Sequence, residues 1–356
     1  MAGAKGGQEL LKNANKIVVK VGTSSLTNAN GKLNINRMDQ LVCQLIALYK
    51  TGKQVILVSS GAVGAGMGRL NLSKRPNYMG QKQALAAIGQ GILMEIYEKL
   101  FREQGITVAQ VLLTKEDFIH RERYLNARNT FGALWDYGVI PIVNENDTVA
   151  FEELKLGDND TLAALVATLV AADLLILLSD IDGLYTANPR VDAAARRLDV
   201  VEEITPGIQA MAGGVGSNLG TGGMMTKIQA ATIASACGIP VVLANGSQAG
   251  VLESIIAGDN KGTLFLAKER SLNGKKGWLA FGSQPVGTVF VDKGAAKAII
   301  EQGSSLLAKG IKKVTGDFKA GDIVAVKLDK GSGEEIARGL ANYSAGDIGL
   351  IMGHHS

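Results

Sequence analysis

The chain has 356 residues, of which 46% are hydrophobic and 20% are charged, so it carries enough apolar side chains for two packed domains. Its net charge of +4 does not require nucleic acid as a partner. No stretch reaches the roughly 18–20 uninterrupted apolar residues of a membrane helix, so we expect no membrane contact.

Processing and cysteine signals predict a cytoplasmic protein. Residues 1–15 hold no hydrophobic signal core and are expected to form a loose leader. Cys43 and Cys237 lie in apolar contexts without metal-ligand spacing, and we interpret both as small core residues. Such a use of cysteine fits a reducing compartment.

Two kinds of segment, strand-like and helix-like, alternate along the chain up to about residue 265. The short β-branched runs, which predict strands, are 17–21, 54–59, 107–112, 139–143, 174–178 and 240–244. The longer stretches with helical spacing are 36–50, 80–104, 126–137, 161–171 and 224–237. Strands and helices in alternation predict an α/β domain, with a parallel sheet covered on both faces.

The alternation of strand-like and helix-like segments ends at the charged and polar stretch 267–276. Beyond it, strand-like runs at 287–291, 322–328 and 336–340 are separated by glycines, and a helix is expected at 295–301. This pattern predicts a small, β-rich second domain.

Neither of two standard nucleotide-binding fingerprints is present. No Gly-Lys pair is followed by Ser or Thr, as a P-loop requires, and the pattern that begins at Gly64 has Arg69 where a dinucleotide-binding motif needs its third glycine.

Three other glycine clusters each suit a phosphate group. Residues 20–24 follow a strand and begin with Lys20, and residues 59–66 follow the next strand. Residues 220–227 precede a helix and end with Lys227. The alternatives are an ordinary turn, tight strand–helix packing and a flexible linker, respectively. Because ligands of open parallel sheets bind at the carboxyl ends of the strands, three such loops on one edge favour a phosphate site.

A polar cluster follows the strand at 139–143. It comprises residues 144–147 and, before the next helix, 158–160. The second group alternatively caps that helix, which leaves the first group unexplained. We interpret the cluster as a site for a zwitterion, in which Asp147 holds an ammonium group and Asn159 holds a carboxylate.

The chemistry of this domain has to proceed without histidine, since we interpret His120, its only histidine, as a surface residue. Phosphoryl transfer to a carboxylate meets this condition, because the acceptor is already an anionic nucleophile. Ser179 and Asp180, after the strand at 174–178, are expected to position the nucleotide or its Mg²⁺.

Several strings closely resemble the glutamate 5-kinase family of the amino acid kinase superfamily. They are VVKVGTSSLT, SSGAVGAG, LLTKEDFIHRERYLNARNT, PIVNENDTVA, KLGDNDTLAAL, LLSDIDGLYTANPR and GTGGMMTKIQAA. The resemblance implies an amino acid kinase domain at 16–267, a three-layer α/β/α sandwich with a mainly parallel central sheet. It also implies a PUA-like domain at 277–356 that is cut short at its C-terminus.

The resemblance implies most of the following site residues, and the polar cluster described above adds the others. The catalytic residues are Lys20, Lys227 and Asp160. The glutamate-binding residues are Ser60, Asp147, Asn159, Asn144 and Asp158. The ATP-binding residues are Lys20, Ser179, Asp180, Thr221, Gly222, Gly223, Met224, Met225, Thr226 and Lys227. Direct metal ligands are not assigned.

The implied reaction uses ATP and Mg²⁺ to convert L-glutamate to L-glutamyl 5-phosphate, the first step of proline biosynthesis. The implied partners are proline as a feedback inhibitor, a reductase that receives the acyl phosphate, and further copies of the chain. Residues 118–129 are expected to form an exposed loop beside the acceptor.

Two alternatives remain open. One is a related kinase that acts on aspartate, N-acetylglutamate, carbamate or a nucleoside monophosphate. The other is an RNA-binding protein, which the slightly basic C-terminal region and its resemblance to PUA domains suggest. RNA contact by the second domain is also compatible with the kinase interpretation.

Overall fold

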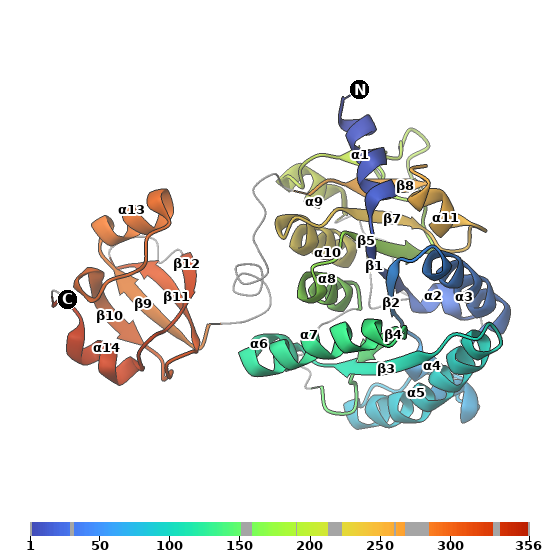
Figure 1. Ribbon diagram of the computed structural model, residues 1–356, viewed down its shortest axis with the longest axis horizontal. Coiled ribbons are helices and arrows are strands. Elements are labelled where there is room, and N and C mark those ends of the chain that lie inside the picture. The colour runs from blue at the N-terminus through green and yellow to red at the C-terminus, as the bar shows by residue number, and fades with distance from the viewer. Residues whose placement is uncertain are drawn as a thin grey trace. The chain divides into compact units, whose positions relative to one another are not determined.

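The computed structural model describes residues 2–28, 32–150, 159–189, 191–212, 223–259, 261–267, 285–329 and 335–354 (Figure 1). The chain divides into two compact units, residues 1–274 and 275–356. Among the described residues, every helix is too short or too polar to cross a membrane.

The first unit alternates strands and helices. Its strands are β1 (Lys16–Val21), β2 (Gln54–Val58), β3 (Val108–Leu113), β4 (Ile140–Glu145), β5 (Leu174–Ser179), β6 (Val200–Val201), β7 (Val241–Asn245) and β8 (Gly262–Phe265). Its helices are α1 (Ala2–Asn13), α2 (Thr23–Leu26), α3 (Ile35–Lys50), α4 (Ala62–Arg69), α5 (Met79–Arg102), α6 (Lys115–Ile119), α7 (Arg121–Asp136), α8 (Asn159–Val170), α9 (Pro206–Ala212), α10 (Met224–Ala236) and α11 (Val251–Ile256).

These strands form one sheet in the order β3-β4-β2-β1-β5-β7-β8-β6. All neighbouring strands are parallel except β7 and β8. Strands β4 and β5 are buried along their whole length, as expected for a sheet that is covered on both faces. The predicted α/β class with a mainly parallel sheet is confirmed.

Helices cover both faces of the sheet, which completes the predicted three-layer sandwich (Figure 1). Helices α1, α3, α5 and α11 pack on one face and share a core with the strands. Helices α7, α8 and α10 pack together on the other face. Because neighbouring strands of the central part are parallel, their carboxyl ends form one edge, and the first residues of α8 and the first turn of α10 lie there.

The expectation of a loose leader is not met over the described N-terminal residues, which form α1. Leu11 is 1% exposed and belongs to the main core. Gly7 lies so close to Leu264 that a Cβ atom on it would be 2.8 Å from that side chain. Tertiary packing thus outweighs the low helix propensity of this glycine-rich segment, which misled the sequence interpretation.

The expectation of an exposed loop at 118–129 was wrong, because helices α6 and α7 occupy this segment. Helix α6 begins with a capping box between Thr114 and Asp117. Phe118 and Tyr124 are buried, whereas His120, between the two helices, is exposed as predicted.

The interpretation of both cysteines as core residues was also wrong. Cys43 is exposed, because it lies on the outer face of the amphipathic helix α3, and Cys237 at the end of α10 is only partly buried. The apolar residues on either side of Cys43 in the sequence face the core, which made its context look buried.

Helices α4 and α5 approach each other at two glycines. A Cβ atom on Gly66 would lie 2.0 Å from the carbonyl oxygen of Leu85, and one on Gly89 would lie 1.8 Å from the carbonyl oxygen of Ala62. Gly66 therefore serves close helix packing, the alternative considered for the glycine cluster at 59–66. Gly61 in the same cluster has φ 98°, a left-handed conformation that favours glycine.

The second unit is small and rich in strands. Its elements are β9 (Gly287–Val291), α13 (Lys293–Gln302), η3 (Ala308–Gly310), β10 (Ile311–Thr315), β11 (Ile323–Leu328), β12 (Glu335–Leu340) and α14 (Ala345–Ile351). The sheet has the order β10-β9-β11-β12, with β9 and β11 parallel and the outer pairs antiparallel. Val289, Val291, Phe318 and Val324 lie in a core of its own. The predicted β-rich second domain is confirmed.

The α4–α5 contact predicts opposite effects for two glycines of the same helix. Gly89→Ala places a methyl group against the backbone of Ala62 and is expected to lower the free energy of unfolding by about 1–3 kcal/mol or more. Gly91→Ala, the control, meets no atom within 4 Å and is expected to raise it by about 0.5–1 kcal/mol, the difference in helix propensity. Urea unfolding of both variants tests this, and a Gly89→Ala variant as stable as Gly91→Ala would contradict the packing.

Candidate active site

Polar side chains from neighbouring strands meet at the carboxyl edge of the sheet. Lys20 lies near the end of β1, Ser59 and Ser60 follow β2, Asn144 lies near the end of β4, and Ser179 ends β5. All five are at least nine-tenths buried. The structure therefore gathers the predicted strand-end residues along one edge, in the order in which their strands lie in the sheet.

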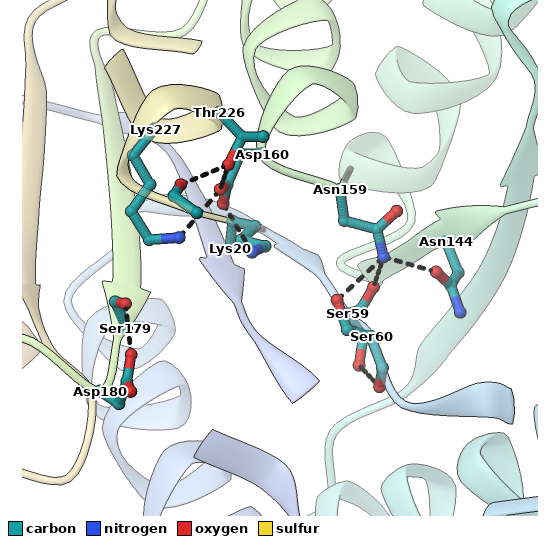
Figure 2. Close-up of polar contacts among 11 residues, drawn as sticks. Lys20, Ser59, Ser60, Asn144, Asn159, Asp160, Ser179, Asp180, Thr226 and Lys227 are labelled. Atoms are coloured by element: carbon teal, nitrogen blue, oxygen red, sulfur yellow. Dashed lines mark hydrogen bonds and ion pairs between the residues drawn. The ribbon is translucent and has the colours of Figure 1, made fainter. Parts of the chain in front are cut away.

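Two lysines that are far apart in the sequence converge on one carboxylate. The Nζ atom of Lys20 lies 2.6 Å from Oδ1 of Asp160, and the Nζ atom of Lys227 lies 3.1 Å from Oδ2 (Figure 2). Asp160 is fully buried, and the two lysines are 3% and 6% exposed. Such a burial of charge is tolerated because each ammonium group faces a carboxylate oxygen.

The two ammonium groups set the charge state of Asp160. Burial by itself raises the pKa of this carboxyl, but the attraction of Lys20 and Lys227 and their hydrogen bonds together outweigh burial and lower the pKa to about 2. Because this pKa lies below the ordinary value of about 4, the ion pairs stabilise the fold above about pH 4. That stability is lost as the pH falls towards 2, and Asp160 is ionised at neutral pH.

Thr226 connects this ion-pair cluster to the start of α10. Its hydroxyl lies 2.9 Å from Oδ2 of Asp160 and 2.7 Å from the carbonyl oxygen of Gly223. Gly223, the N-cap of α10, supplies no side chain to the first turn of the helix. The backbone N–H groups of that turn, together with Lys227, suit an anion.

Asn159, the residue before Asp160, faces the other way along the edge. Its amide nitrogen lies 2.6 Å from the carbonyl oxygen of Ser59 and 2.9 Å from the hydroxyl of Ser60. The same nitrogen lies 2.9 Å from Oδ1 of Asn144, so three acceptors surround its two hydrogens. Figure 2 shows Asn159 turned towards β2 and β4 and Asp160 turned towards the two lysines.

Two residues that the sequence interpretation missed support this amide cluster from α5. Oε1 of Gln90 accepts a hydrogen bond of 2.8 Å from the amide of Asn144. The hydroxyl of Tyr97, a fully buried residue, lies 3.0 Å from the hydroxyl of Ser59. Burial raises the pKa of this Tyr97 hydroxyl above its ordinary value, so it remains protonated. The sequence signal that could have identified Gln90 is its position on the apolar face of a helix, one turn from Ala86 and from Leu93.

Ser179 and Asp180 lie on the far side of the lysines from Asn159 (Figure 2). The hydroxyl of Ser179 donates to Oδ1 of Asp180 over 3.1 Å. Ser179 is buried, whereas Asp180 is exposed and presents a carboxylate at the edge of the sheet.

Of the other predicted site residues, the structure describes Asp147, Met224 and Met225. Asp147 lies in the turn after β4 and is half-buried. Met224 and Met225 form the start of α10, and Met225 is 51% exposed. Asp158, Thr221 and Gly222 lie outside the described residues.

A hollow of about 630 Å³ borders the turn that carries Asp147. Its lining is mostly polar and includes Gln83, Thr114, Arg123, Asn146 and Thr148. The turn therefore faces open space that is accessible to a small polar molecule.

Comparison with known families identifies both units. The model of the amino acid kinase family matches residues 15–245, and the model of the PUA domain matches residues 287–356. A glutamate 5-kinase of Moorella thermoacetica is 54% identical over 343 residues, which cover 96% of this chain and 90% of that protein. A glutamate 5-kinase of Caldanaerobacter subterraneus is 55% identical over 338 residues, or 95% and 90% of the two chains.

Solved structures of two other kinases share the fold of the first unit. The carbamate kinase of Giardia lamblia aligns with a TM-score of 0.54 at 15% identity, over 72% of this chain and all of that one. The UMP kinase of Ureaplasma parvum aligns with a TM-score of 0.51 at 12% identity, over 71% of this chain and 99% of that one. At these identities the likeness supports the fold alone.

The sequence likeness to the two bacterial enzymes extends over both units, and the first unit has the amino acid kinase fold. The chain therefore belongs to the glutamate 5-kinase family and joins an amino acid kinase domain to a PUA domain.

Proposed function

We infer that the chain transfers the terminal phosphoryl group of ATP to the side-chain carboxylate of L-glutamate and forms L-glutamyl 5-phosphate. This is the first step of proline biosynthesis. The relatives that cover nearly the whole chain are glutamate 5-kinases. The observation that supports the mechanism best is the convergence of Lys20 and Lys227 on Asp160, between an amide cluster and the start of α10.

The order of groups along the sheet edge suggests how the substrates align. The amide cluster at β4 and β2 would hold glutamate, the lysines beside β1 would lie at the point of transfer, and β5 with α10 would hold the nucleotide. Such an arrangement places acceptor, moving group and donor in one row, as in-line displacement requires.

In the proposed step, an oxygen of the glutamate side chain forms a bond to the γ-phosphorus. The bond from that phosphorus to the β–γ bridging oxygen breaks, and ADP leaves with the electron pair. No proton has to be removed from the acceptor, since the carboxylate is already ionised at neutral pH. This agrees with a buried centre that consists of amines and a carboxylate.

Lys20 and Lys227 would offset the negative charge on the phosphoryl group during transfer. Asp160 holds both amines in place through ion pairs of 2.6 and 3.1 Å, so little reorganisation is needed when the nucleotide arrives. The negative charge of Asp160 also offsets the repulsion between the two ammonium groups when the site holds no anion.

Glutamate binding would use the predicted acceptor residues. Asp147 offers a carboxylate to the ammonium group, and the hydroxyl of Ser60, which accepts from Asn159, can donate its own hydrogen to a carboxylate. The NH₂ group of Asn159 already faces three acceptors, so this residue would contact glutamate through Oδ1, which suits the ammonium group. Asn144 contacts Asn159 directly and so belongs to the same group. Asp158 keeps the auxiliary role predicted for it from the sequence.

Donor binding would use the first turn of α10 and the end of β5. The described start of α10, from Gly223 to Lys227, leaves backbone N–H groups available to phosphate oxygens. The exposed carboxylate of Asp180 suits Mg²⁺, which usually takes one or two carboxylates and completes its shell with phosphates and water. When bound, Mg²⁺ would neutralise charge on the phosphates.

The remaining expectations about partners stay predictions. They are inhibition by proline, transfer of the acyl phosphate to a reductase, assembly with further copies of the chain, and RNA contact. The match to the PUA domain supports the prediction of RNA contact.

Loss of one converging amine should impair turnover more than folding. Lys227→Ala is expected to lower kcat by roughly 10²-fold or more, the effect of removing one key electrostatic contact from a transition state. Lys50→Ala, an exposed lysine on α3, is the control and should retain normal turnover. Steady-state ADP release measures both variants, and near-normal kcat for Lys227→Ala would refute its role.

The acceptor site should distinguish free glutamate from related acids. ADP release in the presence of glutamate is expected to exceed that with aspartate, N-acetylglutamate, carbamate or UMP. The physical reason is that Asp147 favours a free ammonium group, which N-acetylglutamate, carbamate and UMP lack. Aspartate has this group, but its side chain is one methylene shorter and would hold its carboxylate further from the γ-phosphorus. Faster turnover with any of the other acceptors would reassign the substrate.

Removal of divalent cations should abolish turnover reversibly. Treatment with EDTA is expected to stop ADP release, and added Mg²⁺ should restore it, because the phosphate charges are otherwise poorly neutralised. Asp180→Asn should raise the Mg²⁺ concentration needed for half-maximal rate. Unchanged Mg²⁺ dependence in this variant would remove Asp180 from the metal site.

A further inference from the structure

Helix α5 carries three polar residues on its buried face at a spacing of seven. They are Gln83, Gln90 and Tyr97, which lie in line along the helix because seven residues make nearly two turns. The same face presents Ala86, Leu93 and Phe101 to the core. Polar groups on such a face are costly unless they form hydrogen bonds, and each of the three does. We call Gln83, Gln90 and Tyr97 the polar stripe of α5.

Each member of the polar stripe contacts a different segment of the acceptor side. Gln83 donates to the carbonyl oxygen of Ala150, in the turn that carries Asp147, over 3.2 Å. Gln90 accepts from Asn144 at the end of β4 over 2.8 Å. Tyr97 lies 3.0 Å from Ser59 after β2. One helix thus holds three segments that are distant in the sequence.

Gln90 stands at the base of a directed chain of hydrogen bonds. The two ends of an asparagine amide are similar in size, but one donates and the other accepts. Oε1 of Gln90 accepts a hydrogen bond from the NH₂ group of Asn144. Because the NH₂ end of the Asn144 amide faces Gln90, its other end, Oδ1, faces the site. That Oδ1 accepts from the backbone N–H of Glu145 and from Asn159, each over 2.9 Å.

Tyr97 supports Asn159 by a second route, through Ser59. Its contact with the Ser59 hydroxyl fixes the segment whose carbonyl oxygen accepts from Asn159 over 2.6 Å. The close α4–α5 contact at Gly66 and Gly89 holds α5 rigidly beside this segment. Asn159 is therefore oriented through two routes, and both begin on α5.

We propose that Gln90 is a positioning residue for the acceptor, which acts by orienting Asn144 and, through it, Asn159. Tyr97 and Gln83 share this role as the other members of the polar stripe. Gln90 does not itself meet the nucleotide side, because its contact is with β4, three strands from β5 in the sheet. The inference rests on the proposed function, since it assigns Asn159 to glutamate.

The test is a steady-state comparison of both substrates in the full-length protein. Gln90→Met preserves the length of the side chain and removes its acceptor oxygen. We expect the KM for glutamate to rise about 10-fold, the scale of one lost hydrogen bond, while the KM for ATP stays unchanged. Gln81→Met, on the exposed face of the same helix, is the control and should change neither KM.

A double-mutant cycle asks whether Gln90 acts through Asn144. If it does, Gln90→Met combined with Asn144→Ala should raise the KM for glutamate no further than Asn144→Ala alone. Additive effects would overturn the proposed route. An unchanged KM for glutamate in Gln90→Met, or an equal rise in both KM values, would overturn the positioning role.

The same assay separates this inference from the proposed function. A wild-type protein that shows no glutamate-dependent ADP release would refute the proposed function and the inference with it. A wild-type protein that phosphorylates glutamate, together with a Gln90→Met variant of equal KM, would refute the inference alone. Tyr97→Phe gives an independent check and should raise the KM for glutamate without changing that for ATP.

Discussion

The ion pairs of one buried carboxylate with two lysines organise the site. Asp160 is fully buried between Lys20 and Lys227, and neither amine could lie in this environment without it. The cluster joins the start of α8, the end of β1 and the first turn of α10. A charge arrangement of this kind is costly to assemble, so the surrounding secondary structure has to place its members accurately. The parallel sheet does this by bringing strand ends to one edge.

Two consecutive residues at the start of α8 connect the halves of the site. Neighbouring residues of a helix point about 100° apart, so Asp160 reaches the lysines while Asn159 reaches β2 and β4. The lysine cluster and the amide cluster are thus set by the same helix turn. A shift of α8 would disturb both clusters together, so the packing of α8 against α7 and α10 helps to hold both in place.

Helix α5 belongs to the opposite layer and supports the site from beneath the sheet edge. Its glycines allow α4 to approach closely, and α4 follows directly after Ser60 and Gly61. Its polar stripe contacts the segments that surround Asn159. The amide cluster therefore depends on both helical layers, whereas the lysine cluster is formed by residues of β1, α8 and α10.

The sequence by itself determined the class of fold, the succession of an α/β part and a β-rich part, and which polar residues follow the strands. Apolar runs between glycines predicted the strands, and polar residues after those runs predicted the edge where Lys20, Asn144 and Ser179 meet. These features are local, because strand ends in a parallel sheet share one edge whatever the order of the strands. The strings around Lys20, Asn159 and Lys227 were distinctive enough to indicate the family.

Only the tertiary structure decided which groups touch. Nothing local shows that Lys20 and Lys227 share one carboxylate, since they are 207 positions apart and meet only when β1 and α10 pack beside α8. Gln90 and Tyr97 resemble ordinary residues of a long helix until the partners across the core are known. The sequence also failed to predict helix α1 at the start of the chain and the exposure of Cys43. Both depend on packing partners and on the orientation of helices, which are long-range properties that composition does not encode.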